Sequence, residues 1–231
     1  MRAERVIGIS DYIEVLPILL QGLNVTLWVL LGSILVGYFI AFVAGFGRLA
    51  KNPIINKFTA VYVEIFRGTS LVVQLFWFYY VLPLLLGLEL TNFQAAMLAG
   101  ILAIGLNYGA YMSEVVRGSI LAVPKGQYEA TTALNMSRWQ RMRLVIFPQA
   151  VRMMLPEFGN YAIQMLKATS LVYFIGLADM TFQATTFRGT HISMTIPLFT
   201  MLLVAYFIVA LPLLGLTKWF EKLASKGVAS E

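Results

Sequence analysis

The fold is decided by a polar, arginine-rich stretch at residues 114–160, whose centre reads EATTALN at residues 129–135 and VIFP at residues 145–148. Long apolar runs lie on both sides of this stretch. A chain this apolar has little reason to keep one large ordered polar loop unless another molecule docks there. We therefore expect this stretch to be the part of the sequence that indicates the function most clearly.

The composition around the stretch is that of a membrane protein. Hydrophobic residues make up 59% of the chain and charged residues 12%, against about 25% charged residues in soluble domains. We expect five spans, at about residues 20–46, 60–88, 93–116, 160–180 and 192–216. Each run is long enough to cross a hydrocarbon core of about 30 Å as a helix. Because lipid satisfies no backbone polar groups, the sequence predicts an all-α polytopic membrane protein.

The basic residues predict the orientation of these spans. Most of the 17 Lys and Arg residues fall on one side, in residues 47–67, 117–152 and 218–226. Cytoplasmic loops carry such an excess, so we expect the N-terminus outside and the C-terminus in the cytoplasm. The net charge of +6 then reflects membrane orientation and gives no case for nucleic-acid binding.

On this topology, residues 1–231 form a single transmembrane domain. It has an amphipathic lead-in at residues 1–19, a cytoplasmic loop at 117–157 and a cytoplasmic tail at 217–231. A frayed terminus is the alternative for the lead-in. The first apolar run is too long for the core of a signal peptide and is followed by basic residues, so we expect no cleaved leader.

Several kinds of site are excluded by residue type. The chain has no cysteine, so disulfides and cysteine-based metal or redox sites are absent, and its one histidine, His191, cannot build a metal site alone. The sequence holds no phosphate-cradling Gly-x-x-x-x-Gly-Lys-Ser/Thr loop and no nucleophile–base constellation. We therefore expect no enzyme activity, no metal and no cofactor bound by this chain.

Polar side chains within the second and third runs are candidates for lining a pathway. Arg67, Gln74 and Trp77 recur, together with Ser70, at spacings that place them on one face of a continuous helix. Hydrogen bonding between helices is an equally good account of that face. In the third run, Asn107 and Tyr111 share a face, and Glu114 and Arg117 have the spacing of a local ion pair.

The fourth run repeats the pattern with Asn160, Gln164 and Lys167 on one face. If the span began at residue 158, Lys167 would lie too deep to reach the interface freely. Either the membrane portion starts nearer residue 165, or Lys167 faces a pathway or a carboxylate. Asp179, near the outer end, is expected at the interface.

The central stretch resembles the EAA motif of bacterial ABC-importer permeases, which reads Glu-Ala-Ala, three residues, Gly, nine residues, and Ile-x-Leu-Pro. Glu129, Ala130 and Pro148 match outright, whereas Thr131 replaces Ala and Asn135 replaces Gly. Segments beginning at residues 67, 114, 124, 147 and 167 resemble the polar amino-acid uptake branch, the histidine, glutamate/glutamine and arginine permeases. The similarity runs from about residue 20 to residue 220.

The departure at Asn135 predicts the local structure of the loop. A helix that ends at a left-handed residue prefers Gly, and Asn is the usual substitute. We expect one short helix at about residues 126–134 and a second from about residue 137, with Ser137 as its N-cap. Trp139, Met142 and Ile146 would anchor the second helix. The alternative is an interfacial helical hairpin that binds nothing.

The resemblance implies a type I ABC-importer transmembrane domain in the bacterial cytoplasmic (inner) membrane. Implied partners are a cytoplasmic ATPase dimer that binds ATP and Mg, a second permease copy or paralogue, and a periplasmic or lipid-anchored solute-binding protein. Apolar side chains such as Met136 would be buried in the ATPase, and Arg141 and Arg143 would pair with its acidic rim. The residues expected to couple to the ATPase are Gly126, Glu129, Ala130, Ala133, Leu134, Asn135, Arg138 and Pro148.

The function implied is import of amino acids or similar zwitterions by alternating access. The residues expected along the substrate pathway or its gate are Arg67, Gln74, Trp77, Asn107, Tyr111, Asn160, Gln164 and Lys167. Compatible solutes such as ectoines, and opines, stay open as substrates. The alternative is a stand-alone channel or proton-coupled secondary carrier, which would need a buried acidic relay; Glu64, Glu114 and Glu157 all fall near span ends.

Overall fold

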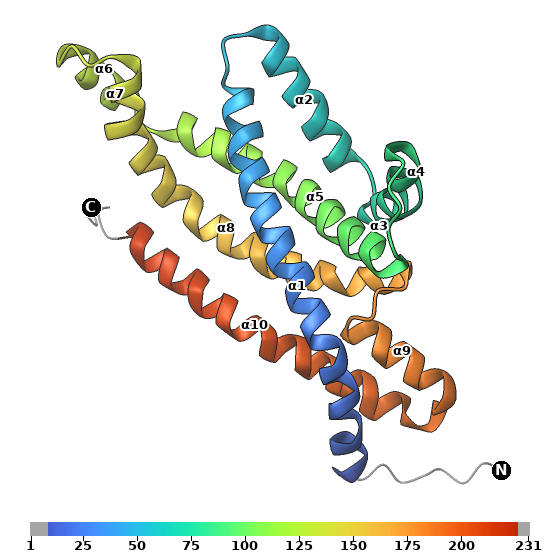
Figure 1. Cartoon of the computed structure of the whole chain (residues 1–231). Helices are drawn as coiled ribbons and strands as arrows, with labels where there is room; N and C mark the ends of the chain where they lie inside the picture. The colour runs from blue at the N-terminus through green and yellow to red at the C-terminus, as the bar shows by residue number, and fades with distance from the viewer. Residues whose placement is uncertain (1–8, 226–231) are drawn as a thin grey trace. The chain divides into compact units, whose positions relative to one another are not determined.

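The computed structural model describes residues 9–225, and all regular elements in that range are helical (Figure 1). Three helical stretches are long and apolar enough to cross a membrane: Ser10–Arg48, Asn92–Ala122 and Ile192–Ser225. Two bent pairs, Pro53–Gly68 with Leu71–Leu86 and Arg138–Ile175 with Met180–Thr190, qualify when each pair counts as one span. The prediction of an all-helical, multi-span protein is confirmed, with three to five candidate spans.

The helices follow one another with short connections. In the first half they are α1 (Ile9–Arg48), α2 (Pro53–Gly68), α3 (Leu71–Phe76), the π-helix η1 (Trp77–Val81), α4 (Leu82–Leu86) and α5 (Asn92–Ala122). The second half has α6 (Lys125–Ala133), α7 (Arg138–Arg141), the π-helix η2 (Met142–Ile146), α8 (Phe147–Thr169), the 3-10 helix η3 (Ser170–Ile175), α9 (Met180–Thr190), the 3-10 helix η4 (Ile192–Met194) and α10 (Thr195–Ser225). Residues 9–19 are the first turns of α1, and 217–225 the last turns of α10. Residues 1–8 of the expected lead-in and 226–231 of the expected tail lie outside the described residues.

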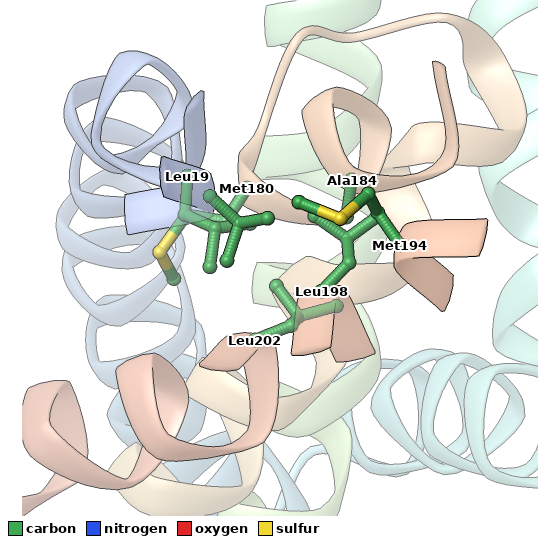
Figure 2. Packing of buried hydrophobic residues seen from close by; sticks show 7 residues of the cluster. Leu19, Met180, Ala184, Met194, Leu198 and Leu202 are labelled. Carbon is green, nitrogen blue, oxygen red and sulfur yellow. The ribbon is translucent and has the colours of Figure 1, made fainter. Parts of the chain in front are cut away.

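The chain divides into two compact units. Among the described residues, the first unit comprises 9–35, 70–105 and 164–212, and the second comprises 36–69, 106–163 and 213–225. One apolar cluster in the core of the first unit comes from α1, α9, η4 and α10 (Figure 2). Its buried members are Val15, Leu19, Met180, Ala184, Met194, Leu198 and Leu202.

Asp179, which we expect near the membrane interface, is buried within the first unit. The carboxylate caps the start of α9, accepting hydrogen bonds from the backbone N–H of Phe182 at 2.9 Å and of Thr181 at 3.2 Å. The Tyr206 hydroxyl of α10 donates to the same carboxylate at 3.1 Å. The first N–H groups of a helix have no partners within the helix. A buried capping side chain accepts their hydrogen bonds where water is absent.

The second span is interrupted, which corrects the expectation of one polar face. α2 ends at Gly68, Thr69 and Ser70 are extended, and α3 begins at Leu71. Two extended residues break the helical period, so Arg67 and Ser70 do not share a continuous helical face with the residues of α3 and η1. The Thr69 hydroxyl donates to the Ile65 carbonyl at 2.7 Å, a bond that competes with helix continuation.

Glycines allow helices to approach closely in both units. A side chain at Gly22 of α1 would overlap the backbone of Asp179 and Met180, and one at Gly45 would meet Val116 of α5 at 2.7 Å. Thr26, one turn after Gly22, accepts a hydrogen bond from the Met180 N–H at 3.3 Å. Small residues give such contacts in lipid, where the hydrophobic effect does not drive helices together.

We predict that Gly22→Ala lowers the melting temperature of the detergent-solubilised protein, because the added methyl group displaces the start of α9. Overpacking of this kind costs about 1–3 kcal/mol. Gly215→Ala in α10 is the matched control, since a side chain there meets nothing within 4 Å. Equal melting temperatures for the two variants, measured by size-exclusion chromatography after heating, would contradict the packing described for Gly22.

Candidate functional site

The polar loop folds into a hairpin of α6 and α7, residues 125–141, which we call the polar hairpin. Asn135 has φ +53°, and it is the only residue other than glycine with positive φ in the described part of the chain. The N–H of Asn135 donates to the Thr132 carbonyl at 3.0 Å, and that of Met136 to the Thr131 carbonyl at 3.0 Å. These two bonds are a Schellman motif, so the predicted left-handed helix end is confirmed.

The start of α7 is fixed by Ser137, as predicted. The Ser137 hydroxyl accepts from the Gln140 N–H at 3.3 Å, and the Gln140 side chain accepts from the Ser137 N–H at 2.9 Å. This capping box satisfies two N–H groups at once. Arg141 also donates to the Thr132 hydroxyl at 2.9 Å, and this bond ties α7 to α6. The polar hairpin is therefore held by side-chain bonds at its turn and across its two helices.

The surface of the polar hairpin carries apolar side chains that nothing in the described chain covers. Leu134 is 71% exposed and Trp139 70% exposed, so the expectation that Trp139 anchors the second helix is wrong. Ile146 is fully buried, as expected of an anchor, and Met142 is half-buried. The expected coupling residues Gly126, Glu129, Ala130, Ala133, Asn135, Arg138 and Pro148 are all exposed, as is Leu134.

A shallow, open depression of about 370 Å³ lies on α6 and is lined by Tyr128, Glu129, Thr132 and Ala133. It places one carboxylate among small and aromatic side chains. Exposed apolar groups next to a charged side chain are typical of a protein-docking surface. The chemistry of the polar hairpin is therefore that of a rigid contact element.

The second group of predicted residues meets at the end of α2. The Asn107 amide donates to the Phe66 carbonyl at 2.8 Å, and the Tyr111 hydroxyl donates to the Arg67 carbonyl at 3.2 Å. Both carbonyls belong to the last turn of α2, which has no intrahelical partners left. In the other direction, the Tyr62 hydroxyl of α2 donates to the Leu106 carbonyl of α5 at 2.7 Å. The structure thus brings Arg67, Asn107 and Tyr111 together.

Tyrosines that the sequence reasoning missed surround this junction. The Arg67 guanidinium lies 5.2 Å from the centre of the Tyr111 ring. Tyr161 of α8 lies 6.4 Å from Tyr111 and 6.2 Å from Tyr108, and the Tyr108 and Tyr111 rings are 6.4 Å apart. Tyr161 follows Asn160 directly, but no local pattern indicates that α8 meets α5 at this residue.

The expected ion pair between Glu114 and Arg117 is present at 2.9 Å, and it extends to a third residue. Arg48, at the end of α1, contacts the other carboxylate oxygen at 3.1 Å. Glu114 therefore joins α1 to α5 in the second unit. Residues 10–225 contain no group of three His, Asp or Glu side chains that could hold a metal ion.

The other predicted pathway residues lie on α3, η1 and α8. Asn160, Gln164 and Lys167 are all exposed along α8, as their spacing predicts. Lys167 forms no ion pair with any residue that the structure describes. Gln74 is buried in the first unit, and Trp77 of η1 is 44% exposed.

Comparison with known proteins shows the family. The family model described as binding-protein-dependent transport system inner membrane component matches residues 33–226. A probable amino-acid ABC transporter permease protein, y4tF of Sinorhizobium fredii, is 45% identical over 206 residues, 88% of this chain and 85% of the relative. The glutamine transport system permease protein GlnP of Escherichia coli is 38% identical over 194 residues, 81% of this chain and 87% of the relative.

A solved structure agrees with these relatives. The crystal structure of an amino acid ABC transporter with histidines is 30% identical and superimposes with a TM-score of 0.82, over 94% of this chain and 99% of that chain. The chain belongs to the family of binding-protein-dependent transport system inner membrane components, as a multi-pass permease subunit of an amino-acid ABC importer in the bacterial inner membrane, whose ATP is hydrolysed by separate subunits.

Proposed function

We propose that the polar hairpin is the element through which a cytoplasmic ATPase dimer drives this permease. The observation that carries the proposal is an apolar, uncovered surface on a hairpin whose turn is fixed by a Schellman motif and a capping box. Ala130, Ala133 and Leu134 would enter a groove of the ATPase, and Glu129 would contact its rim. Arg138, also exposed, would pair with an acidic group there.

The polar hairpin continues into the membrane without a helical break. α7, η2 and α8 follow one another from Arg138 to Thr169, and this run carries Asn160, Gln164 and Lys167 on exposed positions. A movement of the hairpin would therefore act on the side chains that we assign to the pathway. The permease would alternate between outward and inward access as ATPase closure favours one state.

The proposed topology has five spans, with the N-terminus outside and the C-terminus in the cytoplasm. The basic residues of α2, the polar hairpin and α10 would then face the cytoplasm, in keeping with the distribution of charge. A second permease copy or paralogue would complete the pore, and a periplasmic or lipid-anchored binding protein would deliver the solute.

An amino acid or similar zwitterion is the proposed cargo, and the residues that we assign to its pathway or gate are Arg67, Gln74, Trp77, Asn107, Tyr111, Asn160, Gln164 and Lys167. GlnP is named as a glutamine transport permease, and y4tF is named as a probable amino-acid transporter permease. Family membership argues against the alternative of a stand-alone channel or proton-coupled carrier. Within the described chain, moreover, Glu114 is held by two arginines and is poorly placed as a free proton relay.

We expect Glu129→Arg to reduce solute-stimulated ATPase activity of the reconstituted importer to its basal level, because the reversed charge opposes docking of α6. Membrane insertion should be normal, since Glu129 is exposed and outside the apolar cores. Glu221→Arg, an equal charge reversal on the exposed side of α10, is the control. Unchanged stimulation in Glu129→Arg would remove the polar hairpin from coupling.

Lys167→Met should lower solute uptake by about tenfold to a hundredfold while the importer still assembles, because a lost charged contact is worth about 1.5–3 kcal/mol. Lys167 is exposed on α8, so the substitution leaves the packing of the chain intact. Lys218→Met on α10 provides the matched control. Uptake kinetics equal to wild type would take Lys167 off the pathway.

A further inference from the structure

An ion pair joins the end of α1 to α5. The Arg48 side chain donates to one carboxylate oxygen of Glu114 at 3.1 Å, and the Arg117 side chain donates to the other oxygen at 2.9 Å. The side chains of Arg48, Glu114 and Arg117 are 24%, 21% and 35% exposed. Arg117 lies three positions after Glu114 on α5, so its bond stays within one helix. The Arg48 bond, in contrast, connects two helices.

The backbones of α1 and α5 also approach closely before they reach this ion pair. A side chain at Gly109 of α5 would meet the Gly37 carbonyl of α1 at 3.1 Å, and one at Gly45 of α1 would meet the Ser113 carbonyl of α5 at 3.0 Å. Closely packed elements move as one body, because their contacts do not deform continuously. The ion pair therefore closes one end of an extended contact between α1 and α5.

α2 is attached to the same end of α1. The Asn56 amide donates to the Arg48 carbonyl at 2.6 Å, and a side chain at Gly47 would overlap the methyl group of Thr59. The Tyr62 hydroxyl bonds α2 to α5 as well. These contacts all lie within the second unit. Arg48 is thus the residue at which three helices meet, since its side chain contacts α5 and its carbonyl contacts α2.

The polar hairpin is bonded to the end of α5. The Tyr128 hydroxyl of α6 donates to the Ile120 carbonyl at 3.1 Å. Ile120 belongs to the last turn of α5, whose carbonyls have no partners within the helix. α5 ends at Ala122 and α6 begins at Lys125, so this bond bridges a short connection. A continuous series of contacts therefore runs from α6, through α5, to α1 and α2.

We propose that the Arg48–Glu114 ion pair, which we call the α1–α5 clasp, makes α1 and α2 follow the movement of the polar hairpin. This assignment rests on the proposed function, in which closure of the ATPase moves the hairpin. The clasp stays closed throughout the transport cycle, so α5 carries both helices with it. Arg48 and Glu114 are positioning residues, because they act on neighbouring helices and contact no solute.

A positioning role of the clasp can be distinguished from a stabilising role. A partly exposed ion pair contributes little to the free energy of unfolding, so its loss should leave assembly and the melting temperature close to those of the wild type. Loss of a transmitting contact instead lowers the number of solute molecules carried per ATP hydrolysed. The ATPase still docks on the polar hairpin, but α1 and α2 no longer follow the hairpin.

The first test measures uptake and ATP hydrolysis by the importer in proteoliposomes, with the labelled L-amino acid that the wild type takes up best. Arg48→Gln should lower the ratio of solute carried to ATP hydrolysed by about threefold, the size of effect expected from a partly exposed ion pair. Arg117→Gln is the matched control, because it removes the other ion pair of the same carboxylate and leaves the clasp in place. It should keep the wild-type ratio. A wild-type ratio in Arg48→Gln, or an equal loss in Arg117→Gln, would overturn the proposal.

The second test closes the clasp chemically. The chain has no cysteine, so Arg48→Cys combined with Glu114→Cys introduces the only two thiols of this chain. The double variant should have a low ratio of solute to ATP, and a flexible bis-methanethiosulfonate crosslinker should restore the ratio, because the clasp stays closed during transport. The two single variants, treated with the same reagent, are the controls. Uptake that stops or stays low after crosslinking would contradict a clasp that remains closed.

The clasp and the proposed function fail in different ways. Unchanged ATPase stimulation in Glu129→Arg would remove the coupling role of the polar hairpin, and the clasp with it. A wild-type ratio in Arg48→Gln, with stimulation still lost in Glu129→Arg, would remove the clasp alone. If Arg48→Gln does not assemble, Glu114→Gln and the crosslinked pair decide by the same criteria.

Discussion

The need to satisfy backbone polar groups within lipid governs how this chain is built. α2 ends at Gly68, and the carbonyls of its last turn have no partners within the helix. Asn107 and Tyr111 of α5 donate to two of them. The start of α9 instead leaves backbone N–H groups without helical partners. The side chains of Asp179 and Thr26 accept hydrogen bonds from these N–H groups. At the end of α2 and at the start of α9, polar side chains from a neighbouring element or from the helix's own cap thus satisfy backbone groups.

This constraint changes how polar residues within spans should be interpreted. Asn107 and Tyr111 have the spacing of pathway residues, yet their first role is to complete the end of α2. Gln74 is polar and buried in the first unit. Periodic polarity therefore identifies residues that meet protein or water, and it does not by itself separate helix capping from contact with a solute. Arg67 differs because its side chain is exposed and forms no ion pair with a described residue, while its backbone carbonyl accepts the hydrogen bond from Tyr111.

Sequence reasoning succeeded where the chemistry is local. The left-handed Asn135, the Ser137 cap and the Glu114–Arg117 pair all involve residues at most a few positions apart, and all are present. It failed where partners are distant in the chain: the Asn107 amide reaches a carbonyl 41 residues away, and the Arg48 side chain pairs with an acid 66 residues away. The break after Gly68 was missed because apolar residues continue on both sides of it, and Arg67 and Ser70 were interpreted as part of one continuous helical face.

The proposed coupling role places a particular demand on α8. Pro156 lies inside this helix, lacks an N–H and so weakens the ladder at that point. Just beyond it, the Phe158 carbonyl accepts a hydrogen bond from the Tyr38 hydroxyl at 2.8 Å, and Gly159 packs against Thr217 of α10. A helix that is weakened at Pro156 and held by contacts at Phe158 and Gly159 would bend there in preference to elsewhere. Motion of the polar hairpin would then turn α8 about these residues, immediately before the exposed Asn160, the first of the proposed pathway residues on α8.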